Sequence, residues 1–124
     1  MASGAFQFFG GSADNIIQKI TGTSATIIAG DANYAIFVPW FTCSEIAGGI
    51  PNLTVEKYDG TTSYYMGAGG VTYIAKGLTA KQSVIFDAGY WLNPGQYIRV
   101  TSSVANQVDV VGVRSLPNTQ GAGG

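Results

Sequence analysis

Histidine is absent from this chain of 124 residues, and cysteine occurs once, as Cys43. The absence of histidine removes the commonest general base, the commonest metal ligand and every Ser-His-acid triad. A single cysteine cannot form a disulfide within the chain, and without histidine it cannot hold a structural zinc ion. The sequence therefore predicts no cofactor, no metal and no enzymatic activity. Phe41 and Ile46 flank Cys43, which predicts a buried and inert thiol.

Charged side chains are scarce, with six basic and seven acidic residues making up 10% of the chain. Soluble domains carry about a quarter. The basic residues are scattered from Lys19 to Arg114, so no stretch can neutralise several phosphates in a row, and we expect no nucleic-acid partner. The acidic residues are also far apart in sequence. Glu56 and Asp59 are the nearest pair, but a turn explains Asp59 better than a two-carboxylate glycosidase site does.

Long apolar runs are missing as well. The longest, from Tyr34 to Phe41, has eight residues, far below the roughly 20 that a membrane-spanning helix needs. The first basic residue is Lys19, and Gly10-Gly11 interrupts the Phe-rich start, so the beginning of the chain does not match a secretory signal. We therefore expect no membrane partner, and synthesis in a host cytoplasm.

The residues that are abundant favour β-strands. Ile and Val together number 21 against four Leu, and 11 Thr raise the β-branched share. Such side chains suit pleated, half-buried strands better than helices. Eighteen Gly and four Pro supply turns without the period of collagen. These features predict an all-β domain without a stable helix.

Short apolar runs alternate with turn residues along the chain, as antiparallel strands require. Gly67 to Gly70 is interpreted as a bulge or kink within one long strand, so we expect seven to nine strands. The runs are Asn15 to Ile20, Ser24 to Ala29, Tyr34 to Thr42, Asn52 to Tyr58, Thr62 to Met66, Val71 to Ala75, Ser83 to Phe86, Gln96 to Ser102 and Gln107 to Arg114.

Three turns set the positions of chain reversal. Asp59-Gly60 matches a two-residue type I′ hairpin. Asn93-Pro94-Gly95 matches a type II turn with Gly95 at the second central position. Between Gly30 and Asn33, the side chain of Asp31 or Asn33 is expected to bond its own backbone.

Alternation within the strands assigns side chains to faces. Ile98 and Val100 share one face of their strand, and Leu53 and Val55 share one face of theirs, as do Val108 and Val110. Two sheets packed through such residues predict an antiparallel β-sandwich, Ig-like or jelly-roll-like, with a β-barrel as the alternative. We expect an extended N-terminal arm over residues 1–13, the sandwich over 14–116 and a flexible C-terminal tail over 117–124.

Aromatic residues are dense, and many occupy both faces of their strands. Neighbours such as Tyr64 and Tyr65, or Tyr90 and Trp91, cannot both point inward. The outward rings either pack on loops of their own domain, bind sugars, or bind another subunit; low charge favours the last. The Phe-rich arm either covers an edge strand of its own domain or reaches a neighbour. The candidate partner-binding residues are Phe6, Phe8, Phe9, Trp40, Tyr64, Tyr65, Tyr90 and Trp91.

The strand spacing over about residues 20 to 114 resembles that of small structural proteins of tailed bacteriophages. An aromatic strand ends near Cys43, and Gln96 stands where that class commonly has an acidic residue. The other segments that carry the resemblance are Thr23-Ser-Ala-Thr-Ile-Ile, Leu53-Thr-Val-Glu, Leu78-Thr-Ala-Lys-Gln-Ser-Val-Ile-Phe and Leu92-Asn-Pro-Gly-Gln-Tyr-Ile-Arg-Val-Thr-Ser-Ser.

The resemblance implies a non-enzymatic virion protein present in many copies, with capsid decoration or cement as the leading function. Its expected partners are other virion proteins, either the major capsid protein or tail proteins, and further copies of itself. A tail, neck or fibre component is the alternative within the same class. A carbohydrate-binding β-sandwich module is the alternative from a different class.

Overall fold

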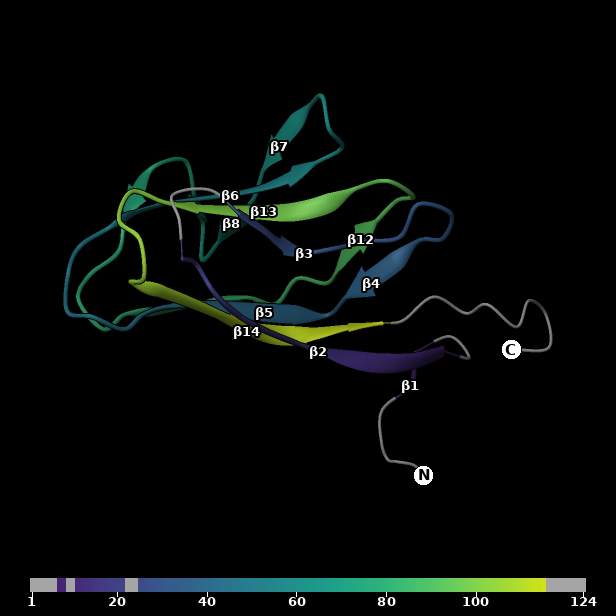
Figure 1. The fold of residues 1–124 in the computed structure, drawn as a ribbon, viewed down its shortest axis with the longest axis horizontal. Coiled ribbons are helices and arrows are strands. Elements are labelled where there is room, and N and C mark those ends of the chain that lie inside the picture. Colours follow the sequence, from purple (N-terminus) through teal and green to yellow (C-terminus); the bar gives the residue numbers. More distant parts are fainter. Residues whose placement is uncertain (1–6, 9–10, 22–24, 116–124) are drawn as a thin grey trace.

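The computed structural model describes residues 7–8, 11–21 and 25–115, and in these residues every regular element is a β-strand. Two antiparallel sheets pack face to face as a sandwich (Figure 1). The all-β sandwich is therefore confirmed. Within the described residues no sheet closes on itself, so the barrel alternative is wrong.

The first sheet has five strands, and β14 lies at its centre. In spatial order they are β1 (Gln7–Phe8), β2 (Gly11–Lys19), β14 (Val108–Ser115), β5 (Trp40–Glu45) and β11 (Ser83–Phe86). The second sheet runs β10 (Lys76–Gly77), β6 (Asn52–Tyr58), β13 (Tyr97–Ser102) and β3 (Ala25–Ile28), and β7 (Ser63–Tyr65) also pairs with β6.

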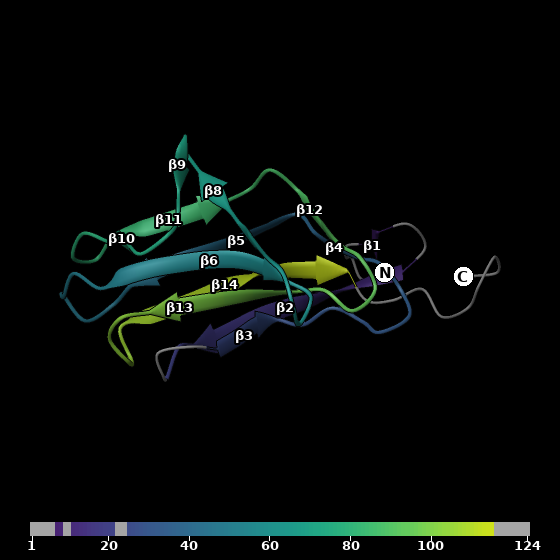
Figure 2. The ribbon, with the colours of Figure 1, turned by 90° about the horizontal axis from the view of Figure 1, so that it is seen from above.

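Two short two-stranded sheets complete the described strands, bringing their number to fourteen against the seven to nine expected. They are β4 (Ile36–Val38) with β12 (Tyr90–Leu92), which are distant in the chain, and the hairpin of β8 (Gly67–Ala68) with β9 (Val71–Thr72). Figure 2 shows the β8–β9 hairpin beside β11, at the side of the sandwich. The additional strands are two or three residues long, too short to leave an alternation pattern in the sequence.

The core lies between the sheets, where alternation directs the apolar side chains. The predicted inner residues of β6, β13 and β14 are fully buried, which confirms their assignment; they are Leu53, Val55, Ile98, Val100, Val108 and Val110. Phe41 stacks on Phe86 with ring centroids 4.7 Å apart. Cys43 is also fully buried, and burial raises the pKa of its thiol to about 12. The buried, inert cysteine is confirmed.

Some strand boundaries differ from the expectation because hydrogen-bonded pairing with a neighbouring strand, and not the alternation of apolar residues, determines where a strand begins or ends. β2 begins at Gly11, four residues before the expected start at Asn15, because it pairs with β14 as far as Ala13 opposite Ser115. The expected strand from Tyr34 to Thr42 is two strands that divide at Pro39, which has no backbone N–H to donate. The division into arm, sandwich and tail stays a prediction, because residues 1–6, 9–10 and 116–124 lie outside the described residues.

Two of the expected turns are confirmed. The Gln96 N–H donates to the carbonyl of Asn93 at 2.9 Å, and Gly95 has φ +87°, as a type II turn requires. The carboxylate of Asp31 accepts hydrogen bonds from the backbone N–H groups of Asn33 and Tyr34.

The two-residue turn at Asp59-Gly60 is wrong. Tyr58 pairs with Ser63, so the loop has four residues, and the carboxylate of Asp59 accepts from the N–H groups of Thr61 and Thr62. The competing local bonds of aspartate explain the longer loop.

The bulge expected at Gly67 to Gly70 is also wrong. Gly69 and Gly70 both have positive φ and connect β8 to β9 as a tight hairpin. Positive φ at both central positions is the type I′ geometry that had been expected at Asp59-Gly60.

Glu45, at the end of β5, binds the backbone of two loops, one at residues 47–49 and one at Lys81. Its side chain is 2% exposed, and its carboxylate accepts from the N–H groups of Lys81, Ala47, Gly48 and Gly49 at 2.8–3.1 Å. These bonds, that of Lys81 foremost, lower the pKa of Glu45, although burial opposes the shift.

We expect Glu45→Gln to lower the Tm by several degrees near neutral pH, because the amide leaves fewer acceptor sites for these N–H groups. A lowered pKa in the folded state stabilises the protein above the unfolded pKa, and this gain is lost as the pH falls through the folded pKa. The Tm gap between wild type and variant should therefore narrow in acid. Thermal unfolding between pH 3 and 7 measures it. Asp87→Asn, at an exposed carboxylate, is the control; a gap independent of pH contradicts the prediction.

Candidate functional site

The aromatic residues singled out in the sequence lie on different parts of the sandwich, as far as the structure describes them. Tyr64 and Tyr65 are on β7 and about half exposed, at 53% and 50%. They face opposite ways, because Tyr65 pairs with Glu56 and Tyr64 pairs with Lys57. Phe6 and Phe9 lie outside the described residues, and Phe8 belongs to β1.

Tyr90 and Trp91 are on β12, which pairs with β4 in a two-stranded sheet. Trp91 is 46% exposed and packs on Phe37, with ring centroids 4.9 Å apart. Tyr90 is half-buried; its ring packs near Phe41, and its hydroxyl accepts a hydrogen bond from the N–H of Ala88. These two rings therefore belong largely to the packing of their own domain.

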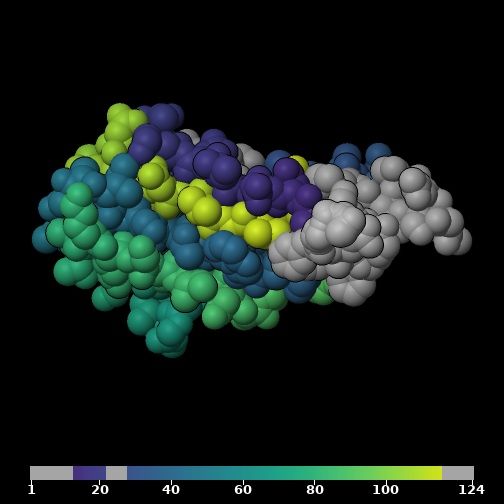
Figure 3. Space-filling view, turned by 90° about the horizontal axis from the view of Figure 1, so that it is seen from below, coloured from purple at the N-terminus to yellow at the C-terminus, as the bar shows by residue number. Residues whose placement is uncertain are grey.

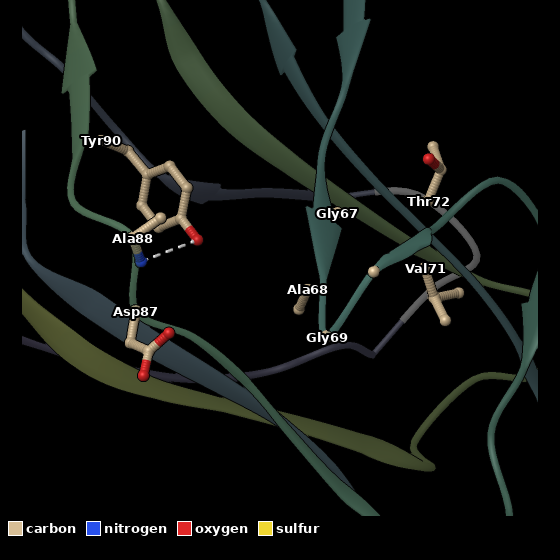
Figure 4. A pocket seen from close by; sticks show the side chains of 9 residues that line it. Gly67, Ala68, Gly69, Val71, Thr72, Asp87, Ala88 and Tyr90 are labelled. Carbon is tan, nitrogen blue, oxygen red and sulfur yellow. Dashed lines mark hydrogen bonds between the residues drawn. The ribbon is translucent and has the colours of Figure 1, made fainter.

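A hollow of about 400 Å³ lies between the β8–β9 hairpin and the segment that leads into β12 (Figure 4). Residues 67–72 form one wall, and Asp87, Ala88 and Tyr90 form the other. The volume falls within the usual range of ligand sites, about 300–1,000 Å³. Its lining offers one carboxylate, and the hydroxyl of Tyr90 is already bonded to Ala88. Calcium and magnesium sites take several oxygen ligands, more than one carboxylate supplies.

The outer face of the first sheet carries a line of β-branched side chains, three aliphatic and one threonine. Alternation points Thr42 of β5 and Ile85 of β11 away from the core, because Phe41, Cys43, Val84 and Phe86 point into it. The strand register places four residues directly side by side across four strands. They are Ile17 of β2, Val111 of β14, Thr42 of β5 and Ile85 of β11. We call these four residues the apolar row.

The members of the apolar row are open to solvent. Ile17 is 78% exposed, Ile85 51% and Val111 43%. The hydroxyl of Thr42 donates to the carbonyl of Val111 at 3.2 Å, so its polar atom already has a partner within the sheet. Figure 3 looks onto this face, where β2, β14, β5 and β11 lie as parallel stripes.

A second line of side chains borders the apolar row two residues further along the strands. It consists of Lys19, Asp109, Ser44 and Ser83, which also lie side by side in register. We call it the polar row. Its members are paired with one another: the Nζ of Lys19 lies 2.6 Å from Oδ1 of Asp109, and the two serine hydroxyls are 2.7 Å apart. A hollow of about 200 Å³ lies where the two rows meet on β2 and β14.

On the far side of the apolar row, two residues back along the strands, Trp40 lies opposite Val113 and Val113 opposite Asn15. Trp40 is half-buried. It is an aromatic residue that the sequence selected, and it lies beside the apolar row.

The aliphatic members of the row were not among the sequence candidates, although the sequence holds a signal for them. Ile16-Ile17 and Val110-Val111 are adjacent apolar pairs within strands, and one member of each pair must point outward. The tyrosine pair on β7 gives the same signal, and the enrichment of aromatic residues at interfaces favours that pair over the aliphatic ones.

The outer face of the second sheet has a different character. The guanidinium of Arg99 lies 3.9 Å from the ring centroid of Tyr58 and 3.1 Å from the carboxylate of Glu56. Tyr97 packs edge-on against Tyr58. Burial works against ionisation of Glu56, but hydrogen bonds from Ser63 and Arg99 prevail and lower its pKa. The charges on this face thus pair with each other.

No helix among residues 7–8, 11–21 and 25–115 is long and apolar enough to cross a membrane. In the same residues, no three carboxylate, thiol or imidazole groups gather where they could hold a metal ion.

Comparisons with known proteins found similarity at the level of solved structures. No family model matches the chain, and no curated protein matches it. Fourteen chains of solved structures match. Two are crystal structures of a pentameric capsid protein from metagenomic phage sequences, each 22% identical with a TM-score of 0.43. Both matches cover 90% of this chain, and they cover 70% and 64% of those chains.

A third match is the capsid asymmetric unit of cyanophage Pam1, at 19% identity and a TM-score of 0.43. That match covers 94% of both chains.

We expect Arg99→Met to destabilise the protein by about 1–3 kcal/mol, because it leaves the buried carboxylate of Glu56 without its cation. The double variant Glu56→Gln with Arg99→Met should recover part of that loss, since no unpaired charge remains. Urea unfolding at pH 7 measures both.

Lys19→Met breaks an ion pair whose two side chains are 44% and 35% exposed, and serves as the control. Its expected effect is below about 1 kcal/mol. Equal losses for Arg99→Met and Lys19→Met, or strict additivity in the double variant, would show that the Arg99–Glu56 pair does not act as described.

Proposed function

We propose that this chain is a non-enzymatic structural protein of a tailed-bacteriophage virion, and that it decorates or cements the capsid. The observation that carries the proposal is the apolar row on an open sheet face. The strand spacing between about residues 20 and 114 supports the class of protein. The row supports the manner of action, which is attachment to neighbouring subunits.

Burial of the apolar row supplies the attractive part of the contact. Removing apolar surface from water contributes about 25 cal/mol per Å². Ile17 and Ile85 are the most exposed members and have the most to bury. Each contact is small, but a symmetric shell repeats it many times, and linked weak contacts give strong attachment.

The charges near the row permit close packing of neighbours. The formal net charge of the chain is −1 at pH 7, so identical copies repel each other weakly. On the outer face of the first sheet, Lys19 and Asp109 neutralise one another within one chain. A neighbour that covers this face therefore meets an ion pair and not an isolated charge.

A tail, neck or fibre position is the second location to which the same properties apply. The copy number per particle separates the two locations. Hundreds of copies favour a position on the shell, and a handful favours the tail.

Carbohydrate binding is a second candidate function, and it rests on a different part of the surface. Tyr64 lies opposite Lys57 in the ladder, and the Nζ of Lys57 donates to the carbonyl of Trp91 at 3.0 Å. Lys57 thus lies opposite one aromatic residue in the ladder and binds the backbone of another, and both of these aromatic residues are about half exposed. A glycan array tests this function: binding that is lost in Tyr64→Ala and Trp91→Ala supports it, and no binding by the wild type rejects it.

We expect the wild-type chain to be present at hundreds of copies in purified particles of the virus that encodes it. Ile17→Lys with Ile85→Lys should lower its occupancy about tenfold or more, because two side chains that bury apolar area are replaced by charges. Tagged copies supplied during infection and counted by quantitative mass spectrometry measure this.

Ile50→Lys is the matched control, since Ile50 is 72% exposed and lies in a loop away from the apolar row. Absence of the wild type from the particles would reject the virion function. Normal occupancy by the double lysine variant would reject the apolar row as the surface of attachment.

A further inference from the structure

We propose that two copies of this chain pack face to face through the apolar row, about a two-fold axis that runs parallel to the strands. The inference rests on the proposed function, which brings many copies together. It goes further by naming the partner of this surface, the symmetry of the contact and the residues that meet.

The apolar row complements itself in shape. Read across the sheet it is Ile17, Val111, Thr42 and Ile85, and all four are branched at Cβ. Valine and threonine have nearly the same shape, so the order is the same from either end. A two-fold contact requires a surface that matches its own copy, which this order provides.

The axis parallel to the strands pairs the ends of the row. Neighbouring strands are about 4.8 Å apart, so Ile17 and Ile85 of one chain are separated by roughly 14 Å across three spacings. An axis midway between β14 and β5, in the plane between the two copies, places Ile17 on the partner's Ile85. It also places Val111 on the partner's Thr42. Four β-branched contacts then form along one line.

The polar row selects this axis over the other axis in the same plane. Rotation about an axis parallel to the strands does not change the position of a residue along the strand direction. The polar row of one copy therefore faces the polar row of the other. Lys19 then faces the partner's Ser83, and Asp109 faces the partner's Ser44. An ammonium and a carboxylate each meet a hydroxyl, which can both donate and accept.

An axis across the strands gives a worse match. It would lay Asp109 over the partner's Val113 and Ser44 over the partner's Trp40. A carboxylate covered by an apolar side chain loses water without gaining a hydrogen bond. The same axis would place each member of the apolar row on its own copy, so Ile17 would meet the partner's Ile17.

The size of the face sets the strength of the contact. Four strands of about six residues cover roughly 19 Å by 20 Å, or about 400 Å² in projection. A stable interface buries about 800 Å² from each partner. The pair is therefore weak in dilute solution and forms where copies are concentrated, as on a shell. The hydroxyl of Thr42 is already bonded to the carbonyl of Val111, so covering the row does not leave this hydroxyl without a hydrogen-bond partner.

Cysteine cross-linking of the full chain tests the contact and its axis together. Under the proposed axis, Ile17→Cys faces the partner's Ile85→Cys across packed sheets about 10 Å apart, which is beyond the reach of a direct disulfide. A short bismaleimide of about that span should therefore join the facing cysteines and give a closed dimer with two cross-links. Cys43 stays silent because it is fully buried. The two substituted side chains are 78% and 51% exposed, so the fold should persist; circular dichroism and the Tm verify this.

The control is the chain with Ile50→Cys and Val104→Cys, two exposed positions away from the apolar row. After reaction with the bismaleimide at equal protein concentration, we expect about tenfold more dimer from the Ile17→Cys, Ile85→Cys chain than from this control. A mixture of the two single variants should also cross-link. Either variant alone should not, because equivalent cysteines are separated by roughly 14 Å along the sheet in addition to the gap between the sheets. Denaturing electrophoresis separates these species.

Three results would overturn the inference. Dimer yields no higher than the control would show that the face does not bind its own copy. Efficient cross-linking of Ile17→Cys alone would show the axis across the strands. A ladder of higher oligomers in place of a closed dimer would show random collision.

The virion function is tested by the presence of the chain in particles, independently of the cross-linking experiment. Wild-type chain found in particles together with failed cross-linking would reject the dimer alone. A closed dimer from a chain absent from particles would reject the virion function alone.

Discussion

The structure depends on one constraint: side chains alternate along a strand, and a two-layer sandwich has only two inner faces. Phe41 and Phe86 fill the inner face of the first sheet, and Ile98 and Val100 fill that of the second. Every apolar residue of the opposite parity must then face outward. The abundance of Ile and Val, which favours strands, therefore also produces an exposed apolar surface on the first sheet.

The sequence predicted the parts of the fold that depend on local pattern. Alternation identified the buried side of β6, β13 and β14, and Pro94-Gly95 identified the type II turn. It did not predict β12, because three residues carry too little pattern, nor the four-residue loop at Asp59. The sequence indicates that one member of each adjacent pair, Ile16-Ile17 and Val110-Val111, faces outward, but it does not show that such residues form a row. Its members come from four distant segments, and only the register of the ladders brings them together.

Most charged side chains described above bind groups of the same chain that lie close to them. Glu45, Asp31 and Asp59 bind backbone N–H groups of adjacent loops, and Arg99 pairs with Glu56 across two strands. A carboxylate that holds a loop in place has few free lone pairs for a ligand. These charged groups thus shape the chain itself, and under the proposed function contact with neighbouring subunits is made by uncharged surface.

The burial of Cys43 has a consequence for the conditions that the protein can tolerate. Its sulfur is sealed between the sheets, and the high pKa keeps it as the thiol and not the reactive thiolate. With a single cysteine in its sequence the chain forms no internal disulfide that glutathione could break, and burial shields the Cys43 thiol from oxidation. The same folded state can therefore persist in a reducing cell interior and in the oxidising medium outside it.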